Sequence, residues 1–192
     1  MFISVYLDKH NLNCGRNYNH HVCLVKGPLN GPKLFRQACA VVMFNIEIWL
    51  IGDDRLIQSF NPMYLTFHTL FCAFNSPRYG HSCNINPGTQ RILITGGFNG
   101  GTLDTTEIID IPTLSVTNAA QMKSKRYEHG MGIMTIDGEE KVVAFGVEFG
   151  NGVFVDLFEV YHANTNSWEL LNINLSEGKN HFGYVTIKEG DI

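Results

Sequence analysis

Four residues near the start of the chain have side chains that commonly bind zinc: Cys14, His20, His21 and Cys23. Their spacing, Cys-x5-His-His-x-Cys, matches none of the common zinc motifs. Two adjacent histidines are also difficult to direct at one metal ion. We therefore interpret this stretch as a polar loop and predict no metal site in it.

The other residues that could take part in catalysis form no recognisable active site. His81 and His129 recur at one position of a repeat, which favours a structural role. Paired carboxylates at 53–54 and 139–140 are typical of exposed turns. The glycine-rich stretch 98–102 leads from one predicted strand to the next, and without a helix N-terminus it is a poor cradle for phosphate. We predict a protein that is not an enzyme and binds no cofactor.

The composition is that of an ordinary globular chain. It has 192 residues, a formal net charge of -4 and no long basic run, so nucleic acid and anionic membranes are not expected partners. No stretch approaches the roughly 20 apolar residues of a membrane span, and the start lacks the pattern of an export signal. We predict a cytoplasmic protein, or a secreted one if the sequence omits the true N-terminus. The five cysteines are an odd, unevenly spaced set and are predicted to be reduced thiols.

The chain repeats itself over three units, residues 36–77, 78–125 and 126–178. Each unit opens with an arginine, continues through four short apolar runs, and has glycine at the end of the second run. The arginines are Arg36, Arg78 and Arg126, and the glycines are Gly52, the pair Gly96-Gly97, and Gly146.

Two apolar anchors, spaced seven residues apart, set the register of the third and fourth runs. The pairs are Phe60 and Phe67, Ile109 and Val116, and Tyr161 and Trp168. A fourth copy of this spacing, Leu7 and Cys14, gives residues 1–35 the pattern of a third and a fourth strand followed by a loop. Residues 179–192 contain the pattern of a first strand, which His181 precedes.

These runs predict an all-β protein built from blades of four antiparallel strands. They are short, rich in β-branched and aromatic residues, and bounded by Gly, Pro, Asn and Asp. One such sheet has two apolar faces and cannot bury either alone, so neighbouring copies must stack. The expected architecture is about three full blades of a β-propeller, with partial blades at both ends.

The ordered recurrence resembles the kelch repeat family. In one unit it rests on Arg78, His81, Gly96, Gly97 and Glu107, and in the next on Arg126, His129, Gly146, Glu159, Tyr161 and Trp168. The chain departs from the family pattern where Asp53 and Phe145 replace one glycine of a pair and where Ile109 and Val116 replace aromatic anchors. Three blades also fall short of a closed ring, which favours an excerpt of a larger propeller over a composite fourth blade.

The resemblance implies a protein-interaction module, as part of an adaptor or scaffold, with a protein or peptide partner. It further implies that the loops after the second strand and those before the first strand line one face, where the repeated arginines contribute to acidic-peptide pockets. The candidate binding residues are Arg36, Arg78, Arg126, Phe98, Asn99, Phe149, Asp53 and Arg55. Two alternatives stay open: each arginine could bind backbone carbonyls of its own blade, and Tyr79 and Tyr127 could serve blade packing or binding.

The alternative function is a propeller enzyme or a carbohydrate-binding protein, possibly secreted. Galactose-oxidase-like enzymes and sialic-acid epimerases resemble this architecture. The copper enzymes need two histidines and two tyrosines that converge on one site, a set that this sequence does not suggest.

Overall fold

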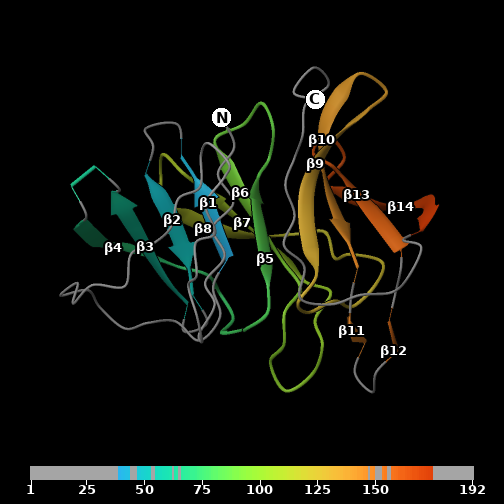
Figure 1. Cartoon of the computed structure of the whole chain (residues 1–192), viewed down its shortest axis with the longest axis horizontal. Helices are drawn as coiled ribbons and strands as arrows, with labels where there is room; N and C mark the ends of the chain where they lie inside the picture. Colours follow the sequence, from blue (N-terminus) through green and yellow to red (C-terminus); the bar gives the residue numbers. More distant parts are fainter. Residues whose placement is uncertain are drawn as a thin grey trace, which may run out of the picture.

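A computed structural model of the chain gives its fold (Figure 1). It describes residues 39–43, 47–52, 55–61, 63–64, 66–146, 148–149, 153–154 and 157–174. For residues 71–73, 148–149, 153–154 and 174 it describes the backbone alone. The partial blades predicted at 1–35 and 179–192 lie outside the described residues.

Three four-stranded antiparallel sheets follow one another along the chain, and the described residues contain no helix. Sheet 1 consists of β1 (Cys39–Val42), β2 (Ile48–Ile51), β3 (Leu56–Asn61) and β4 (Thr66–Ala73). Sheet 2 consists of β5 (Ser82–Ile85), β6 (Arg91–Thr95), β7 (Thr106–Asp110) and β8 (Ser115–Ala119). Sheet 3 consists of β9 (Gly130–Ile136), β10 (Glu139–Phe145), β13 (Leu157–His162) and β14 (Ser167–Asn174). The predicted all-β class and the four-stranded antiparallel units are confirmed.

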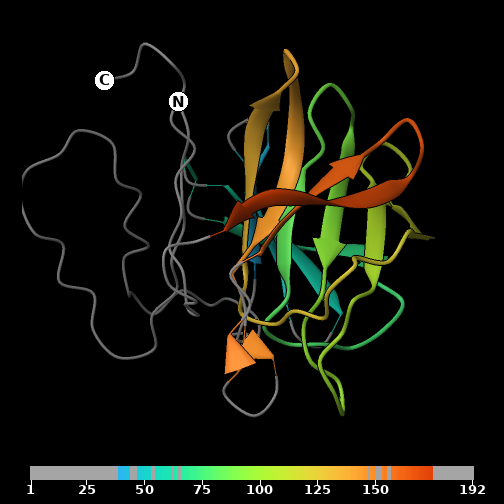
Figure 2. The same cartoon turned by 90° about the vertical axis from the view of Figure 1, so that its right-hand side faces the viewer.

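A small hairpin interrupts sheet 3 between its second and third strands. Its strands are β11 (Glu148–Phe149) and β12 (Val153–Phe154). The sequence analysis expected an irregular loop there. This hairpin and the loop between β6 and β7 project from the same end of the molecule in both views (Figures 1 and 2).

The sheets stack in sequence order. The first strand of each sheet lies beside the first strand of the next, β1 with β5 and β5 with β9 (Figure 1). A core of Ile and Val side chains fills the space between sheets 1 and 2, and Tyr161 and Trp168 help to fill the space between sheets 2 and 3. The described sheets form an arc of three and not a closed ring.

The seven-residue spacing of the anchors reflects direct cross-strand pairing. Phe60 lies opposite Phe67, Ile109 opposite Val116, and Tyr161 opposite Trp168. The two aromatic pairs have ring centroids 4.6 and 5.2 Å apart. Each pair closes the tight turn between the third and fourth strands and presents one continuous apolar surface to a neighbouring layer.

Two of the cysteines form a disulfide, so the prediction of reduced thiols was wrong for them. Cys39 of β1 and Cys83 of β5 are linked, with their Cα atoms 5.8 Å apart. The stacking of first strands brings together residues 44 positions apart in the sequence. An odd total of cysteines could not exclude one such pair, because that pairing depends on the stacking.

The register of sheet 1 differs by one residue from the repeat register predicted from the sequence. Cys39 pairs with the last residue of the second strand, as Ser82 does in sheet 2 and Gly130 in sheet 3. The predicted register had matched Cys39 with His81 instead. Arg78 and Arg126 lie four positions before their strands, and the fourth position before Cys39 is Phe35, not Arg36.

Candidate interaction surface

Arg78 lies in the segment that leads from sheet 1 to β5, and only 3% of it is exposed. Its guanidinium forms an ion pair with Glu107 of β7. It also donates hydrogen bonds to the carbonyl oxygen of Gly96 at 3.0 Å and to the hydroxyl of Thr105 at 2.9 Å. The Glu107 carboxylate accepts a further hydrogen bond, from the backbone N–H of Asn75 at 2.5 Å. The arginine therefore fastens this segment to the second and third strands of its own sheet.

Arg126 repeats this arrangement one sheet later. Its guanidinium lies 2.8 Å from the carboxylate of Glu159 in β13, and both side chains are fully buried. It donates to the carbonyl oxygens of Gly146 at 3.1 Å and Leu157 at 3.0 Å. Glu159 also accepts from the backbone N–H of Lys123 at 2.6 Å. Two independent copies of one network show that the arginine and glutamate positions belong to the repeat.

The placement of Arg78 and Arg126 does not support their candidate role in partner binding. Burial lowers the pKa of both guanidinium groups, while the facing carboxylates oppose that shift. Side chains enclosed in this way cannot contact a partner that docks on the surface. Their contacts match the other interpretation, in which each arginine binds carbonyls within its own blade. Arg36 lies outside the described residues.

The repeated histidines join successive sheets. His81 Nε2 lies 3.0 Å from the carbonyl oxygen of Ile51, the last residue of β2. His129 Nε2 lies 2.8 Å from the hydroxyl of Thr95, the last residue of β6. Desolvation lowers the pKa of His81 to about 4 and places the pKa of His129 well below its ordinary value. Both imidazoles are therefore neutral at pH 7 and act as hydrogen-bonding links between layers.

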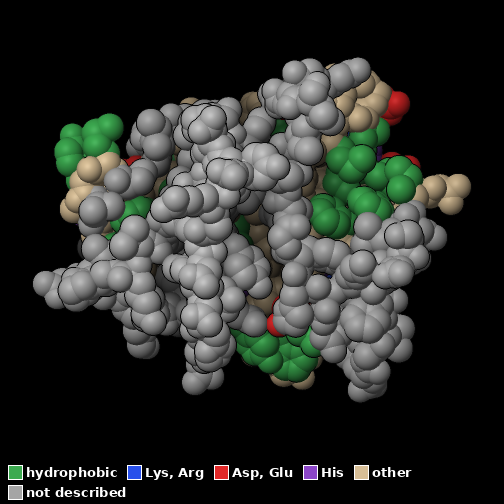
Figure 3. All heavy atoms as spheres, viewed as in Figure 1, with side chains coloured by type: hydrophobic (Ala, Val, Ile, Leu, Met, Phe, Trp, Pro, Cys, Tyr) green, Lys and Arg blue, Asp and Glu red, His purple; other side chains and the backbone are tan. Residues whose placement is uncertain are grey.

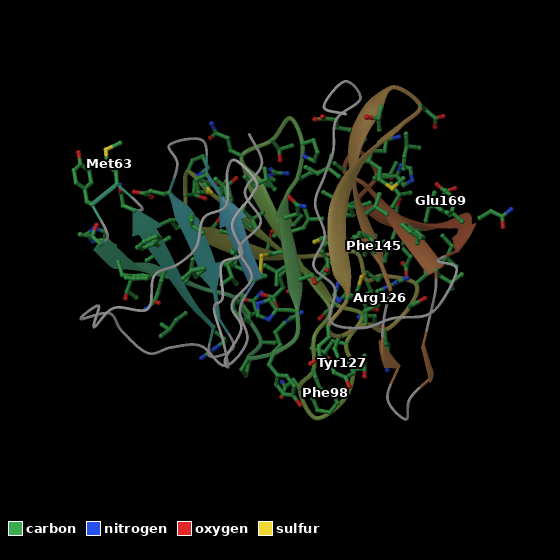
Figure 4. All side chains as sticks on the ribbon, viewed as in Figure 1. Met63, Phe98, Arg126, Tyr127, Phe145 and Glu169 are labelled. Carbon is green, nitrogen blue, oxygen red and sulfur yellow. A yellow bond between two sulfur atoms is a disulfide. The ribbon has the colours of Figure 1, made fainter. Side chains whose placement is uncertain are left out.

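Three aromatic side chains, which we call the aromatic cluster, meet at the end of the stack. Tyr79 comes from the segment before β5, Phe98 from the loop after β6, and Tyr127 from the segment before β9. The Tyr79 and Phe98 ring centroids are 5.4 Å apart, and those of Phe98 and Tyr127 are 5.8 Å apart in an edge-on arrangement. Phe98 thus lies between two tyrosines from successive repeat units (Figure 4).

Backbone hydrogen bonds hold the three loops of the aromatic cluster together. Tyr79 and Phe98 exchange N–H···O bonds of 3.2 and 2.8 Å, as in a short antiparallel ladder. Gly97 donates to the carbonyl oxygen of Arg126 at 2.7 Å, which attaches the loop to the next repeat unit. Because these bonds join segments of different sheets, the cluster is fixed by the stacking itself.

The cluster segments share a left-handed residue after the tyrosine. Gly80 has φ = 62° and Glu128 has φ = 55°, and the N–H of Glu128 donates to the carbonyl oxygen of Gly80 at 2.6 Å. A Cβ at Gly80 would lie 3.3 Å from the Tyr127 ring. The turn therefore directs Tyr79 and Tyr127 outward, on either side of Phe98.

The aromatic cluster is accessible from solvent. Tyr79 is 43% exposed, Phe98 and Tyr127 are half-buried, and Asn99 is exposed beside them. In the space-filling view hydrophobic side chains form a patch at this end (Figure 3), where Figure 4 labels Phe98 and Tyr127. We call this end of the stack the loop end. It carries the segments before β5 and β9, the loop after β6 and the β11–β12 hairpin.

The remaining candidate residues are less informative. Arg55 is exposed, has φ = 68° and donates to the carbonyl oxygen of Asn75 at 3.4 Å. Phe149 belongs to β11, but its side chain is not described, and Asp53 lies outside the described residues. Phe98 and Asn99 are therefore the predicted binding residues that the structure brings to the cluster. The tyrosines complete it, and their shared Arg-Tyr-x-His register was the sequence signal for them.

In the part of the chain that the structure describes, no three His, Cys, Asp or Glu side chains lie close enough to hold a metal ion. The described residues also contain no helix with the length and apolarity needed to cross a membrane. No protein-family model matches the chain, and no curated protein matches it at a significant level.

Proposed function

We propose that this chain is a protein-interaction module built from kelch-type propeller blades, and that it binds a protein or peptide through the aromatic cluster. The observation that carries the proposal is the position of Tyr79, Phe98 and Tyr127 side by side at an exposed end. Blade-like sheets in a repeated register, with buried Arg–Glu pairs at one position, support the kelch assignment.

Clustered aromatic residues are typical of the centres of protein interfaces. A few Trp, Tyr and Arg side chains usually supply most of the binding energy, and a tyrosine offers a large apolar surface with a polar tip. The cluster combines such residues with exposed polar neighbours, among them Asn99. This combination of an apolar centre and a polar rim is suited to a peptide or a protein loop.

The cluster is also preorganised. Hydrogen bonds between backbone groups fix Phe98 to Tyr79 and the adjoining Gly97 to Arg126. The buried ion pairs of Arg78 and Arg126 anchor the residues just before the two tyrosines. A surface that is ordered before binding loses little conformational entropy on association, which favours affinity.

A random-peptide display library provides a probe that can be used while the natural partner is unidentified. Peptides selected on the wild-type protein should bind at the aromatic cluster, so Phe98→Ala should weaken them at least about tenfold, as expected for a hot-spot residue. Met63→Ala is the matched control, because Met63 is 74% exposed in the turn between β3 and β4, away from the loop end (Figure 4). Selected peptides that bind the Phe98 variant at full strength would contradict the proposal.

The disulfide supports placing the module in an oxidising compartment instead of the predicted cytoplasm. Structural disulfides are rare in the reducing cytosol and common in secreted proteins. The Cys39–Cys83 pair joins two sheets of the core and lies in a region with well-packed neighbours. Thiol alkylation in intact cells, followed by mass analysis, tests this assignment: a modified Cys39 and Cys83 would oppose it.

A further inference from the structure

Sheet 3 has an apolar face that points away from sheet 2, which we call the outer face. Alternation along the strands places on it Val143 and Phe145 of β10, Phe158 and Val160 of β13, and Leu171 of β14. The rings of Phe145 and Phe158 are stacked, with centroids 5.4 Å apart. Hydrophobic side chains gather over this sheet in the space-filling view (Figure 3).

The middle of the outer face is fully buried. Val143 and Val160 have 0% and 1% of their surface exposed, whereas Phe145, Phe158 and Leu171 are half-buried around them. A valine at the centre of a bare sheet face would remain open to solvent. The burial of both valines therefore indicates that the outer face is covered.

The outer face is the third copy of a surface that carries a sheet in each earlier case. Ile51, Thr95 and Phe145 end the second strands of sheets 1, 2 and 3, and a glycine follows each. Ile51 accepts the hydrogen bond of His81, and Thr95 pairs with His129, each from the unit that follows. Phe145 occupies the equivalent position, so a histidine of a following unit is expected beside it.

The sequence after β14 supplies such a histidine at the required distance. Residues 74–81, eight in all, link sheet 1 to β5, and residues 120–129, ten in all, link sheet 2 to β9. Both linkers end in a histidine, and the strand begins at the next residue. After Asn174, seven residues, 175–181, again end in a histidine, His181, and an apolar run follows at 182–187.

We infer that residues 182–187 dock on the outer face of sheet 3 as the first strand of a fourth sheet, with His181 bonded to the end of β10. The inference joins the register of the outer face to the linker lengths, and it does not depend on the proposed function. It places the segment 175–181 at the loop end beside the β11–β12 hairpin. The interaction surface would then continue past the aromatic cluster by one further loop of the same kind.

Hydrogen exchange followed by mass spectrometry on the full chain tests the inference. The amides of 182–187 should exchange at least about 100-fold more slowly than in an unstructured peptide, as for strands held in a folded core. β5 and β9 occupy the equivalent position in their own sheets and serve as internal standards. Exchange at the unstructured rate would overturn the inference, and so would protection that rises with protein concentration, because that result would assign the outer face to a second copy.

A substitution distinguishes this docking from other forms of order. His181→Ala should speed exchange in 182–187 by about fivefold, the effect of one lost hydrogen bond, while β5 and β9 keep their protection. His162→Ala is the matched control, since His162 lies partly exposed at the end of β13 and bonds Glu169 at 2.8 Å. Equal exchange of 182–187 in the His181 variant and the wild type would show that the register is wrong.

Discussion

The Arg–Glu pairs of sheets 2 and 3 link burial of charge to placement of the aromatic cluster. Glu107 and Glu159 each accept a backbone N–H from the preceding segment and an N–H from their arginine. A buried carboxylate is tolerated only when its oxygens are bonded in this way. The residue after each arginine is a cluster tyrosine, so the pair orders the surface from beneath.

Removing the charge of Glu159 should destabilise the fold far more than removing that of Glu169. Glu159→Gln leaves Arg126 buried without a counter-charge, and the free energy of unfolding should fall by about 3–5 kcal/mol. Glu169 lies on the neighbouring strand and makes an exposed pair with His162 (Figure 4), so Glu169→Gln should change it by about 0.5 kcal/mol or less. Urea denaturation measures both values. Similar midpoints for the two variants would show that the buried pair is not the stabilising element we describe.

The histidine links should make the fold sensitive to acid. In the unfolded chain a histidine titrates near pH 6.5, whereas the folded-state pKa of His81 is about 4 and that of His129 is also lowered. Below pH 6.5 the unfolded state therefore binds protons that the folded state does not. Stability should fall by about 1.4 kcal/mol per pH unit for each histidine until the folded-state pKa is reached.

Urea midpoints between pH 7 and pH 4.5 test this expectation. His129→Gln removes one titrating group from the interface between sheets 2 and 3, so its stability should depend less steeply on pH than that of the wild type. A variant as steep as the wild type would assign the acid sensitivity to other groups. A higher stability at pH 5 than at pH 7 would contradict the sign.

At the residue scale the sequence predicted which positions repeat better than what each one does. Its pattern identified Arg78, Arg126 and Phe98, but not that the arginines are enclosed. An arginine before a strand can point to solvent or into the sheet, and only the facing glutamate decides between them. Glu107 and Glu159 were visible as repeat residues, yet their distance from the arginines depends on strand pairing.

At the element scale the strands were predictable where alternation and turn residues coincide. The predicted runs 82–85 and 91–95 match β5 and β6, with tight turn signals between them. The outer strands β4 and β14 run past their predicted ends, after bulges at the start of β3 and β13. The β11–β12 hairpin was not predicted, because strands of two residues are too short for a periodic signal.

Two glycines in left-handed turns separate backbone strain from close packing. Gly88 has φ = 69° with open space around it, whereas Gly96 has φ = 60° and a Cβ there would collide with the carbonyl oxygen of Arg126. Gly88→Ala should cost about 1 kcal/mol, from strain alone. Gly96→Ala should cost at least about 2 kcal/mol more, since it must also displace the segment that carries Tyr127.

Thermal denaturation gives the stability of both glycine variants, and tyrosine fluorescence quenching reports the exposure of the aromatic cluster. The Gly96 variant should show increased quenching, while the Gly88 variant should match the wild type. Equal stability losses at the two positions would mean that the contact between Gly96 and the next repeat unit is of little importance.

At the scale of the whole molecule, the contacts between sheets are more varied than the sequence suggested. Apolar packing between layers was predictable from the alternating runs. The polar links were not, since they join residues far apart in sequence: Trp168 Nε1 donates to the hydroxyl of Thr106 at 3.1 Å, and Ser82 bonds the carbonyl of His129. Sheets 1 and 2 have in addition the Cys39–Cys83 disulfide.

The disulfide should stabilise one interface and leave the next unchanged. A cross-link between residues 44 positions apart restricts the unfolded chain, and its loss should lower the free energy of unfolding by about 2–4 kcal/mol. In the double variant Cys39→Ser with Cys83→Ser, amides of β1 and β5 should exchange faster. Amides of β10 and β13 belong to sheet 3 and should keep their rates.

Treatment of the wild type with dithiothreitol should reproduce the behaviour of the double serine variant and should not alter that variant further. This pairing separates loss of the covalent link from any packing defect introduced by serine at Cys83, which is buried in the core. If β10 and β13 lose protection together with β1 and β5, the three sheets unfold as one cooperative unit. Stability would then be distributed over the whole stack, and the independent, layer-by-layer interfaces expected of a repeat architecture would be contradicted.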